Sequence, residues 1–281
     1  MSKLVGLSLL GLVTIAASCG GRTGLPIPEP VEEDPPPSAC EDPEATAIYL
    51  VTERSELMRF DPDAGLVSLV GRLDCGGDTR GEPFSMGVAR DGTAFVVFED
   101  GELFKVDTSD ASCAPTEFDP GQEGFFKFGM GFALEPDHER ERLFVAEISF
   151  FEASLGLATL DTETLELEYV GPFSENLGRV LELTSSSDGS LHGYFLDDAG
   201  QGGWVVKIDK ETAAIEDATF IARPHGHDAL AFAYWGGDYF IFTSPGRETT
   251  VTRFSPSSGL VRDVARIQAG VVGAGVSTCA P

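Results

Sequence analysis

Basic side chains are scarce in this sequence of 281 residues. Lysine and arginine together number 19, against 46 aspartate and glutamate residues, which gives a formal net charge of −27. A nucleic-acid-binding surface needs lysine and arginine to neutralise phosphates, so this deficit argues against nucleic acid as a partner. It also argues against docking on anionic lipid through a basic face. The acidity itself indicates only a well-solvated surface.

Sequence motifs of familiar enzymes are missing as well. The sequence contains no GxSxG nucleophile elbow, no HExxH zinc motif and no GxxxxGK[ST] phosphate loop. It also has no CxxC pair, the signature of a zinc knuckle or a redox dithiol. These absences favour a binding or scaffold protein over an enzyme, and no cofactor is predicted.

A short apolar run opens the chain. It follows Lys3 and spans residues 4–17, which is 14 residues, whereas a membrane-spanning helix needs roughly 20. A basic start before such a run is typical of a secretory signal peptide. Small residues then precede Cys19, an order that resembles the lipobox of bacterial lipoproteins, whose cysteine becomes the lipidated first residue. Ala16 stands where that family usually has leucine, so ordinary cleavage after Ser18 remains the alternative.

The residue after the lipobox cysteine and the segment that follows predict the location and the domain organisation. Gly20 follows in place of aspartate, so the resemblance implies export and anchoring in the outer membrane, on its periplasmic or surface face. Residues 20–39 are rich in proline and acid, and they cannot bury enough apolar surface to fold. We therefore expect a signal peptide over 1–18, the lipidated Cys19 with a semi-rigid stalk over 19–39, and one domain over 40–281.

A repeated apolar strand that ends in an acidic turn organises the rest of the chain. It occurs as LMRFDPDAG, LFKVDTSDA, LATLDTETL, VVKIDKETA and VTRFSPSSG. The turn positions are Asp61, Asp107, Asp161, Asp209 and Ser255. Each unit from the second onwards follows two further short strands joined by a Gly/Asp turn, such as Asp91-Gly92 or Asp188-Gly189. Four strands in roughly 45 to 55 residues is the period of a β-propeller blade.

A strand count predicts how the ring closes. With the strands of a blade lettered A (innermost) to D (outermost), the first unit has strands B, C and D but no strand A. The chain ends in VVGAGVSTCAP, which matches the A strands elsewhere and has no B strand after it. We therefore expect an all-β propeller of five blades, each of four antiparallel strands, in which the C-terminal strand completes the first blade. Six blades is the competing count.

The five cysteines fit this arrangement. If Cys19 is acylated, four remain, and an exported chain meets an oxidising compartment in which disulfides form. The end of an A strand lies near the start of its B strand, so the proposed closure predicts a bond between Cys40 and Cys279. By elimination, Cys75 pairs with Cys113.

The repeat pattern also carries a family resemblance. Its LxxφDxxT/SG units with Gly/Asp hairpins resemble bacterial propellers related to NHL, YncE-like and Kelch-like repeats. Together with the lipobox, the stalk and the GVSTCAP ending, they resemble bacterial propeller lipoproteins. The resemblance implies the fold, export and a membrane partner through the lipid anchor, and it carries over no catalytic residue.

Candidate site residues fall into two groups. A rim on the face of the D-to-A and B-to-C loops is expected to bind a protein or small-molecule ligand. Its members are Phe126, Phe151, Arg179, Arg223, His225 and Trp235. The second group consists of metal candidates. His225 and His227 are two residues apart, so in an extended segment both face one side and could bind a metal. Glu182 stands near the start of an inner strand, and some propellers hold an axial metal with carboxylates, so it defines the alternative function, a metal-dependent hydrolase or lactonase with an axial site.

Overall fold

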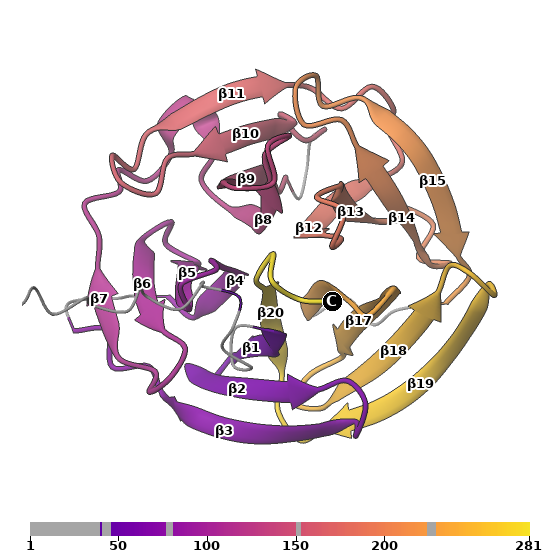
Figure 1. The fold of residues 1–281 in the computed structure, drawn as a ribbon, viewed down its shortest axis with the longest axis horizontal. Helices are drawn as coiled ribbons and strands as arrows, with labels where there is room; N and C mark the ends of the chain where they lie inside the picture. Colours follow the sequence, from indigo (N-terminus) through magenta and orange to yellow (C-terminus); the bar gives the residue numbers. More distant parts are fainter. Residues whose placement is uncertain (1–39, 41–45, 77–80, 150–152, 224–228) are drawn as a thin grey trace, which may run out of the picture. The chain divides into compact units, whose positions relative to one another are not determined.

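The computed structural model describes Cys40 and residues 46–76, 81–149, 153–223 and 229–281, with the backbone alone at 180–181. The described residues form 20 β-strands, and a short 3-10 turn spans Gln122–Gly124. Within the unit Pro37–Pro281, the strands make five antiparallel sheets of four around one axis (Figure 1). Among the described residues, no helix is long and apolar enough to cross a membrane. The predicted five-bladed propeller is confirmed.

Each sheet is one blade, whose four strands are ordered from the axis outwards. Blade 1 contains β20 (Val271–Val276), β1 (Ile48–Thr52), β2 (Glu56–Asp61) and β3 (Leu66–Arg72). Blade 2 contains β4 (Pro83–Val88), β5 (Thr93–Phe98), β6 (Leu103–Asp107) and β7 (Cys113–Pro115). Blade 3 contains β8 (Phe128–Leu134), β9 (Glu141–Glu147), β10 (Leu157–Leu160) and β11 (Leu167–Gly171). Blade 4 contains β12 (Arg179–Ser185), β13 (Leu191–Leu196), β14 (Gly203–Ile208) and β15 (Ile215–Ile221). Blade 5 contains β16 (Ala229–Trp235), β17 (Asp238–Ser244), β18 (Thr249–Ser255) and β19 (Leu260–Ile267).

The two ends of the propeller chain meet in blade 1. Strand β20 pairs with β1 from Ile48 opposite Val276 to Thr52 opposite Val271, and Figure 1 shows the yellow β20 beside the indigo β1 at the axis. The predicted closing strand is therefore confirmed. Both disulfides form with the predicted pairing, Cys40–Cys279 and Cys75–Cys113.

The repeated acidic turns are the C-to-D connections of the five blades. In each, the backbone carbonyl of the anchoring residue accepts a hydrogen bond from the N–H four residues later, at 2.8 or 2.9 Å. The donor residue has a positive φ of 60° to 69° in every blade. These donors are Gly65, Ala111, Leu165, Ala213 and Gly259. Aspartate and serine suit the first position because their side chains cap the N–H groups of the turn, as Asp61 Oδ1 does for Asp63 and Ala64.

The hydrophobic core is divided among the five interfaces between neighbouring blades. One buried cluster fills each interface, and aromatic residues contribute strongly, as where Phe60 of blade 1 packs edge-on against Phe240 and Phe242 of blade 5. Near the axis the inner strands approach closely. A Cβ on Gly131 would lie 2.9 Å from the carbonyl carbon of Leu183 in the next blade, so only glycine fits there.

Chain direction gives the ring two distinct ends. Every inner strand runs from its D-to-A connection to its A-to-B turn. The A-to-B and C-to-D turns therefore share one end of the ring, which we call the A–B end. The D-to-A and B-to-C connections share the opposite end, which we call the D–A end. Function in propellers concentrates in such loops because a rigid scaffold holds them in place.

Candidate functional site

A carboxyl group and a hydroxyl group meet across the axis. Glu182 lies in β12 of blade 4 and Ser85 in β4 of blade 2, two blades that are not neighbours in the ring. Ser85 Oγ donates a hydrogen bond of 2.8 Å to Glu182 Oε2. In both strands the pairing register shifts immediately before the residue concerned. Such a bulge redirects a side chain, and here both side chains meet.

Burial controls the ionisation of Glu182. Its side chain is only 1% exposed, and desolvation raises its pKa well above the usual range. Hydrogen bonds from Ser85 and from the backbone amides of Met130 and Leu183 act in the opposite direction but do not offset burial. Because all these partners are neutral donors, they stabilise the carboxyl group without supplying an opposite charge.

The surroundings of Glu182 bear on the predicted axial metal. Among the residues that the structure describes, no group of three or more His, Cys, Asp or Glu side chains is placed to hold a metal ion. Two of the three weak metal candidates, His225 and His227, lie outside the described residues. In the described part of the chain, Glu182 is thus a polar link between the inner strands of blades 2, 3 and 4.

The Glu182→Gln variant is expected to be more stable than the wild type at alkaline pH. A raised carboxyl pKa stabilises the fold fully below the ordinary glutamate pKa of about 4.3, and this stabilisation is lost as the pH rises towards the folded value. Glutamine stays neutral and keeps the contact with Ser85. Urea unfolding should show a wild-type deficit that grows by more than about 1 kcal/mol between about pH 5 and about pH 8.

A matched control for this prediction is Glu163→Gln, in the exposed C-to-D turn of blade 3. For this variant, the change in the free energy of unfolding between the two pH values should equal that of the wild type. A pH-independent offset between wild type and Glu182→Gln would show that the ionisation of Glu182 does not contribute.

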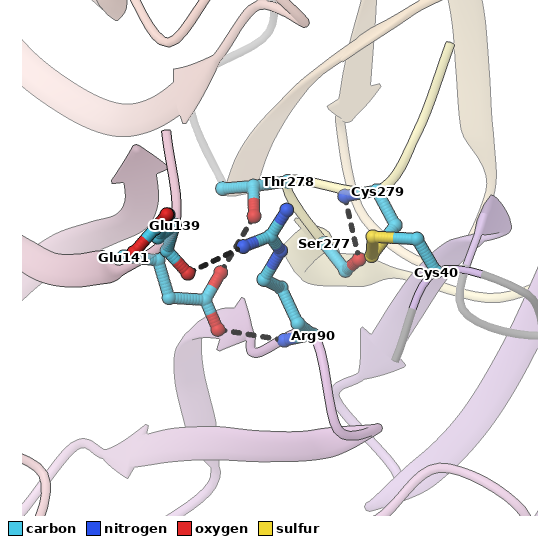
Figure 2. Close-up of a disulfide and its surroundings, with 7 residues drawn as sticks. All are labelled: Cys40, Arg90, Glu139, Glu141, Ser277, Thr278 and Cys279. Carbon is cyan, nitrogen blue, oxygen red and sulfur yellow. Dashed lines mark hydrogen bonds between the residues drawn. A yellow bond between two sulfur atoms is a disulfide. The ribbon is translucent and has the colours of Figure 1, made fainter. Parts of the chain in front are cut away.

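At the A–B end, a second polar cluster joins three blades near the closing disulfide. Figure 2 shows Glu141 of blade 3 between Arg90 of blade 2 and Thr278 at the end of the closing strand. Glu141 Oε1 accepts from the Arg90 backbone N–H at 2.7 Å, and Oε2 accepts from Thr278 Oγ1 at 2.7 Å. Arg90 Nη1 also donates to the Glu139 carbonyl oxygen at 2.9 Å. Burial raises the pKa of Glu141, which these hydrogen bonds partly offset. The cluster therefore fixes the end of the closing strand to two other blades.

A third polar cluster, which also lies at the A–B end, surrounds His192 of β13. Ser186 Oγ lies 3.1 Å from its Nε2, and Tyr239 OH lies 3.0 Å from its Nδ1. A serine beside a histidine suggests an activated nucleophile, but Ser186 Oγ already donates to Asp188 Oδ1 at 2.5 Å. Burial lowers the pKa of His192 to about 4. The arrangement therefore indicates a neutral, hydrogen-bonded link between blades 4 and 5.

The predicted rim residues are only partly together. Phe126 and Arg223 lie in D-to-A connections, and Arg179 begins β12, so these three belong to the D–A end as expected. Arg223 forms an ion pair with Asp263 of β19, on the outer strand of blade 5. Phe151 and His225 lie outside the described residues.

Trp235 does not belong with this rim. It ends β16 immediately before the Gly236-Gly237 turn, at the A–B end, and its Nε1 donates to the Thr46 carbonyl oxygen at 2.8 Å. Its placement on the rim was wrong, because an A strand carries its last residue away from the D-to-A loop that precedes it.

The described surface also has a polar cleft at the A–B end, with a volume of about 300 Å³. It lies between the C-to-D turn of blade 1 and the outer strands of blade 5. Residues 62–65 line one side, and Arg253, Arg262, Asp263 and Val264 line the other. Arg253 and Arg262 are direct cross-strand partners, and Arg253 is neutralised by Asp238. Asp63 and Asp263 also line the cleft, so its lining has two acidic and two basic side chains and no net formal charge.

No protein-family model and no curated protein matches the sequence. Among solved structures, the chain is similar to hydrazine synthase from Kuenenia stuttgartiensis, with 16% identity over 77% of this chain and 64% of that one, and a TM-score of 0.44. It is also similar to TolB from Acinetobacter baumannii (12% identity, 82% and 65% covered, TM-score 0.45). A third is the exo-β-1,3-galactanase from Phanerochaete chrysosporium (11% identity, 66% and 52% covered, TM-score 0.46). The chain spans less than two thirds of each of these proteins. These likenesses carry no argument about function.

Sequence reasoning did not identify the two clusters at the A–B end. Glu141 and Thr278 are 137 residues apart, and no motif surrounds either one. The order Ser186, Asp188 and His192 is local and sits at a predicted Asp-Gly turn. A search for serine and histidine on one hairpin would have found it.

Proposed function

We propose that the protein is an exported lipoprotein, held in the outer membrane through a lipid on Cys19, that uses its propeller as a binding or scaffold module. The apolar run at 4–17, the small residues before Cys19 and the proline-rich segment up to residue 39 support export, lipidation and a stalk, in that order. The resemblance to bacterial propeller lipoproteins supports the same order of segments.

The observation that carries this proposal is the position of the first disulfide. Cys40 immediately follows the proposed stalk and is bonded to Cys279, just beyond the closing strand. The chain therefore enters the propeller at the A–B end. The D–A end, where Phe126 is 50% exposed, is the opposite end of the ring. We assign ligand binding to that end.

The anchoring part is tested with Cys19→Ser in the full chain. Lipidation at Cys19 predicts that wild-type protein fractionates with membranes and that the variant becomes soluble in the envelope. Mass spectrometry of the mature N-terminus gives an independent readout. An unmodified Cys19 at the N-terminus would contradict lipidation and support ordinary cleavage after Ser18.

The binding part is tested by cross-linking the full-length protein in intact envelopes. A Phe126→Ser/Arg179→Glu variant alters the D–A end, and a Glu163→Lys/Glu211→Lys variant alters exposed turns at the A–B end. We expect the first variant to lose a cross-linked partner that the wild type and the second variant retain. Equal capture by all three, or capture by none, would contradict the assignment. Thermal melts confirm that each variant is folded.

The alternative function, a metal-dependent hydrolase or lactonase, has Glu182 as its only described support. This carboxyl group is buried and bonded to Ser85, and the described residues supply no group of three ligands around it. We therefore favour the binding module.

A further inference from the structure

The outermost strand of blade 1 is unusually apolar and exposed. Strand β3 has the sequence LVSLVGR and pairs only with β2, so its outer edge has no partner in the described sheet. Leu66 is 67% exposed, Leu69 is 62% exposed and Val67 is 38% exposed. An exposed, apolar edge strand is a template for pairing with another strand, and most proteins avoid it.

The outer strands of the other blades are protected in ways that β3 is not. Strand β7 has only three residues and is tied back by the Cys75–Cys113 disulfide. The remaining outer strands carry charge within their length: Glu168 in β11, Glu216 and Asp217 in β15, and Arg262, Asp263 and Arg266 in β19. Charged residues on an edge block pairing with a second chain. In β3, the first charged residue is Arg72, its last residue.

The charges at the two ends of β3 are complementary to each other. Arg72 ends the strand and is exposed. At the other end, Asp61 and Asp63 belong to the exposed turn that precedes Leu66. If two copies of β3 pair antiparallel about a two-fold axis at Ser68, Arg72 of each copy lies opposite Ala64 of the other and next to Asp63. An antiparallel pairing thus places each arginine beside an acidic turn.

We propose that β3 pairs with β3 of a second copy of this chain, which joins the two first blades into one continuous antiparallel sheet. Main-chain hydrogen bonds along the edge supply the association, as in other cases of strand addition. Across the two-fold axis the exposed Leu69 of each copy lies opposite the exposed Val67 of the other, and two symmetric Arg72–Asp63 pairs fix the register. The formal net charge of −27 on each copy opposes any self-association, and β3 adds no carboxylate to that repulsion.

The pairing is tested by cross-linking Ser68→Cys in the full chain with a short bismaleimide. Ser68 lies on the proposed two-fold axis, so we expect a covalent dimer that the wild type, with its native cysteines, does not form. The matched control is Thr219→Cys, at a small exposed residue of the outer strand β15, which should give no covalent dimer because that strand lies outside the proposed interface. A product of Ser68→Cys with a different protein would overturn the proposal and indicate a foreign strand on this edge. No cross-linked product would overturn it as well.

Charge variants test the register independently of cross-linking. We expect Leu69→Lys to abolish the dimer in sedimentation velocity at concentrations at which the wild type is dimeric, whereas Thr219→Lys leaves it intact. Arg72→Asp and Asp63→Arg should each weaken the dimer about tenfold. The double variant Arg72→Asp/Asp63→Arg should restore most of the affinity because it exchanges the partners. A double variant as weak as the single ones, or a wild type that stays monomeric, would overturn the proposed pairing.

Discussion

A chain that lacks residues 270–281 is expected to be unfolded under conditions in which the full chain is native. The deletion removes strand β20, which pairs with β1 and packs against the inner strands β4 and β16 of both neighbouring blades. Val271, Ala274 and Val276 of this strand are buried. A buried valine side chain contributes roughly 1.5–3 kcal/mol.

The size of this effect follows from comparing the losses with the total stability. The buried side chains of β20 account for roughly 5 kcal/mol, and loss of Cys279 removes a disulfide that contributes about as much again. A natural domain is stable by only about 5–15 kcal/mol. The deletion also uncovers an edge of β1 and the apolar faces that met β20. The free energy of unfolding should therefore fall to about zero or below.

Circular dichroism and thermal melting of the truncated chain measure this result. A synthetic peptide of residues 268–281, added in excess, should restore part of the melting transition, since a ligand that binds only the native state stabilises it. The same peptide with Gly273→Val is the control. A Cβ at Gly273 would lie 3.0 Å from the Met86 backbone nitrogen, so this peptide should fail. A truncated chain that melts at the wild-type temperature would contradict the role of β20.

Local sequence patterns predicted the repeating parts of the fold. Each C-to-D turn is signalled by one anchoring residue, such as Asp107, whose carbonyl and side chain both accept hydrogen bonds from within the turn, independently of the neighbouring blades. The closing strand was predicted by counting strands. The first blade lacked an inner strand, and the C-terminal strand belonged to no blade, so the second was assigned to the first. The disulfide between Cys40 and Cys279 then followed from chain direction.

The candidate site depends on contacts that no local pattern encodes. Ser85 and Glu182 are 97 residues apart, and they meet only because a bulge in each strand directs both side chains to the same place. A bulge shifts by one residue which side chains face each side of the sheet. The alternation of apolar and polar residues in a single sequence does not show where such a shift occurs. The error over Trp235 has a different cause. Its strand was predicted correctly, but the residue ends that strand and therefore lies at the A–B end, away from the D-to-A loop that precedes the strand.

Replacing both Cys40 and Cys279 with serine is expected to cost about 5 kcal/mol of stability in the chain-entropy model. The bond spans 239 residues of sequence, nearly the whole propeller, and the cost of closing so long a loop in the unfolded chain is large. For a domain of this size, the melting temperature should fall by roughly 10–20 °C.

The second disulfide provides the matched comparison for this prediction. The Cys75–Cys113 bond spans only 38 residues, so the same model gives its removal a cost of about 4 kcal/mol. Removal of Cys40–Cys279 also frees the end of the closing strand, where Thr278 bonds to Glu141. In urea unfolding, the Cys40→Ser/Cys279→Ser variant should therefore be less stable than the Cys75→Ser/Cys113→Ser variant.

Hydrogen exchange separates the two contributions of the Cys40–Cys279 bond. If the bond acts only on the unfolded chain, both double-serine variants should lose amide protection evenly over all blades. If it also holds the closing strand in place, the Cys40→Ser/Cys279→Ser variant should lose protection first in β20 and β1, because local opening there no longer requires unfolding of the ring. We expect the second pattern, since the strand ends at Val276, only three residues before Cys279. Equal stability of the two variants, with uniform exchange, would show that strand pairing alone closes the propeller.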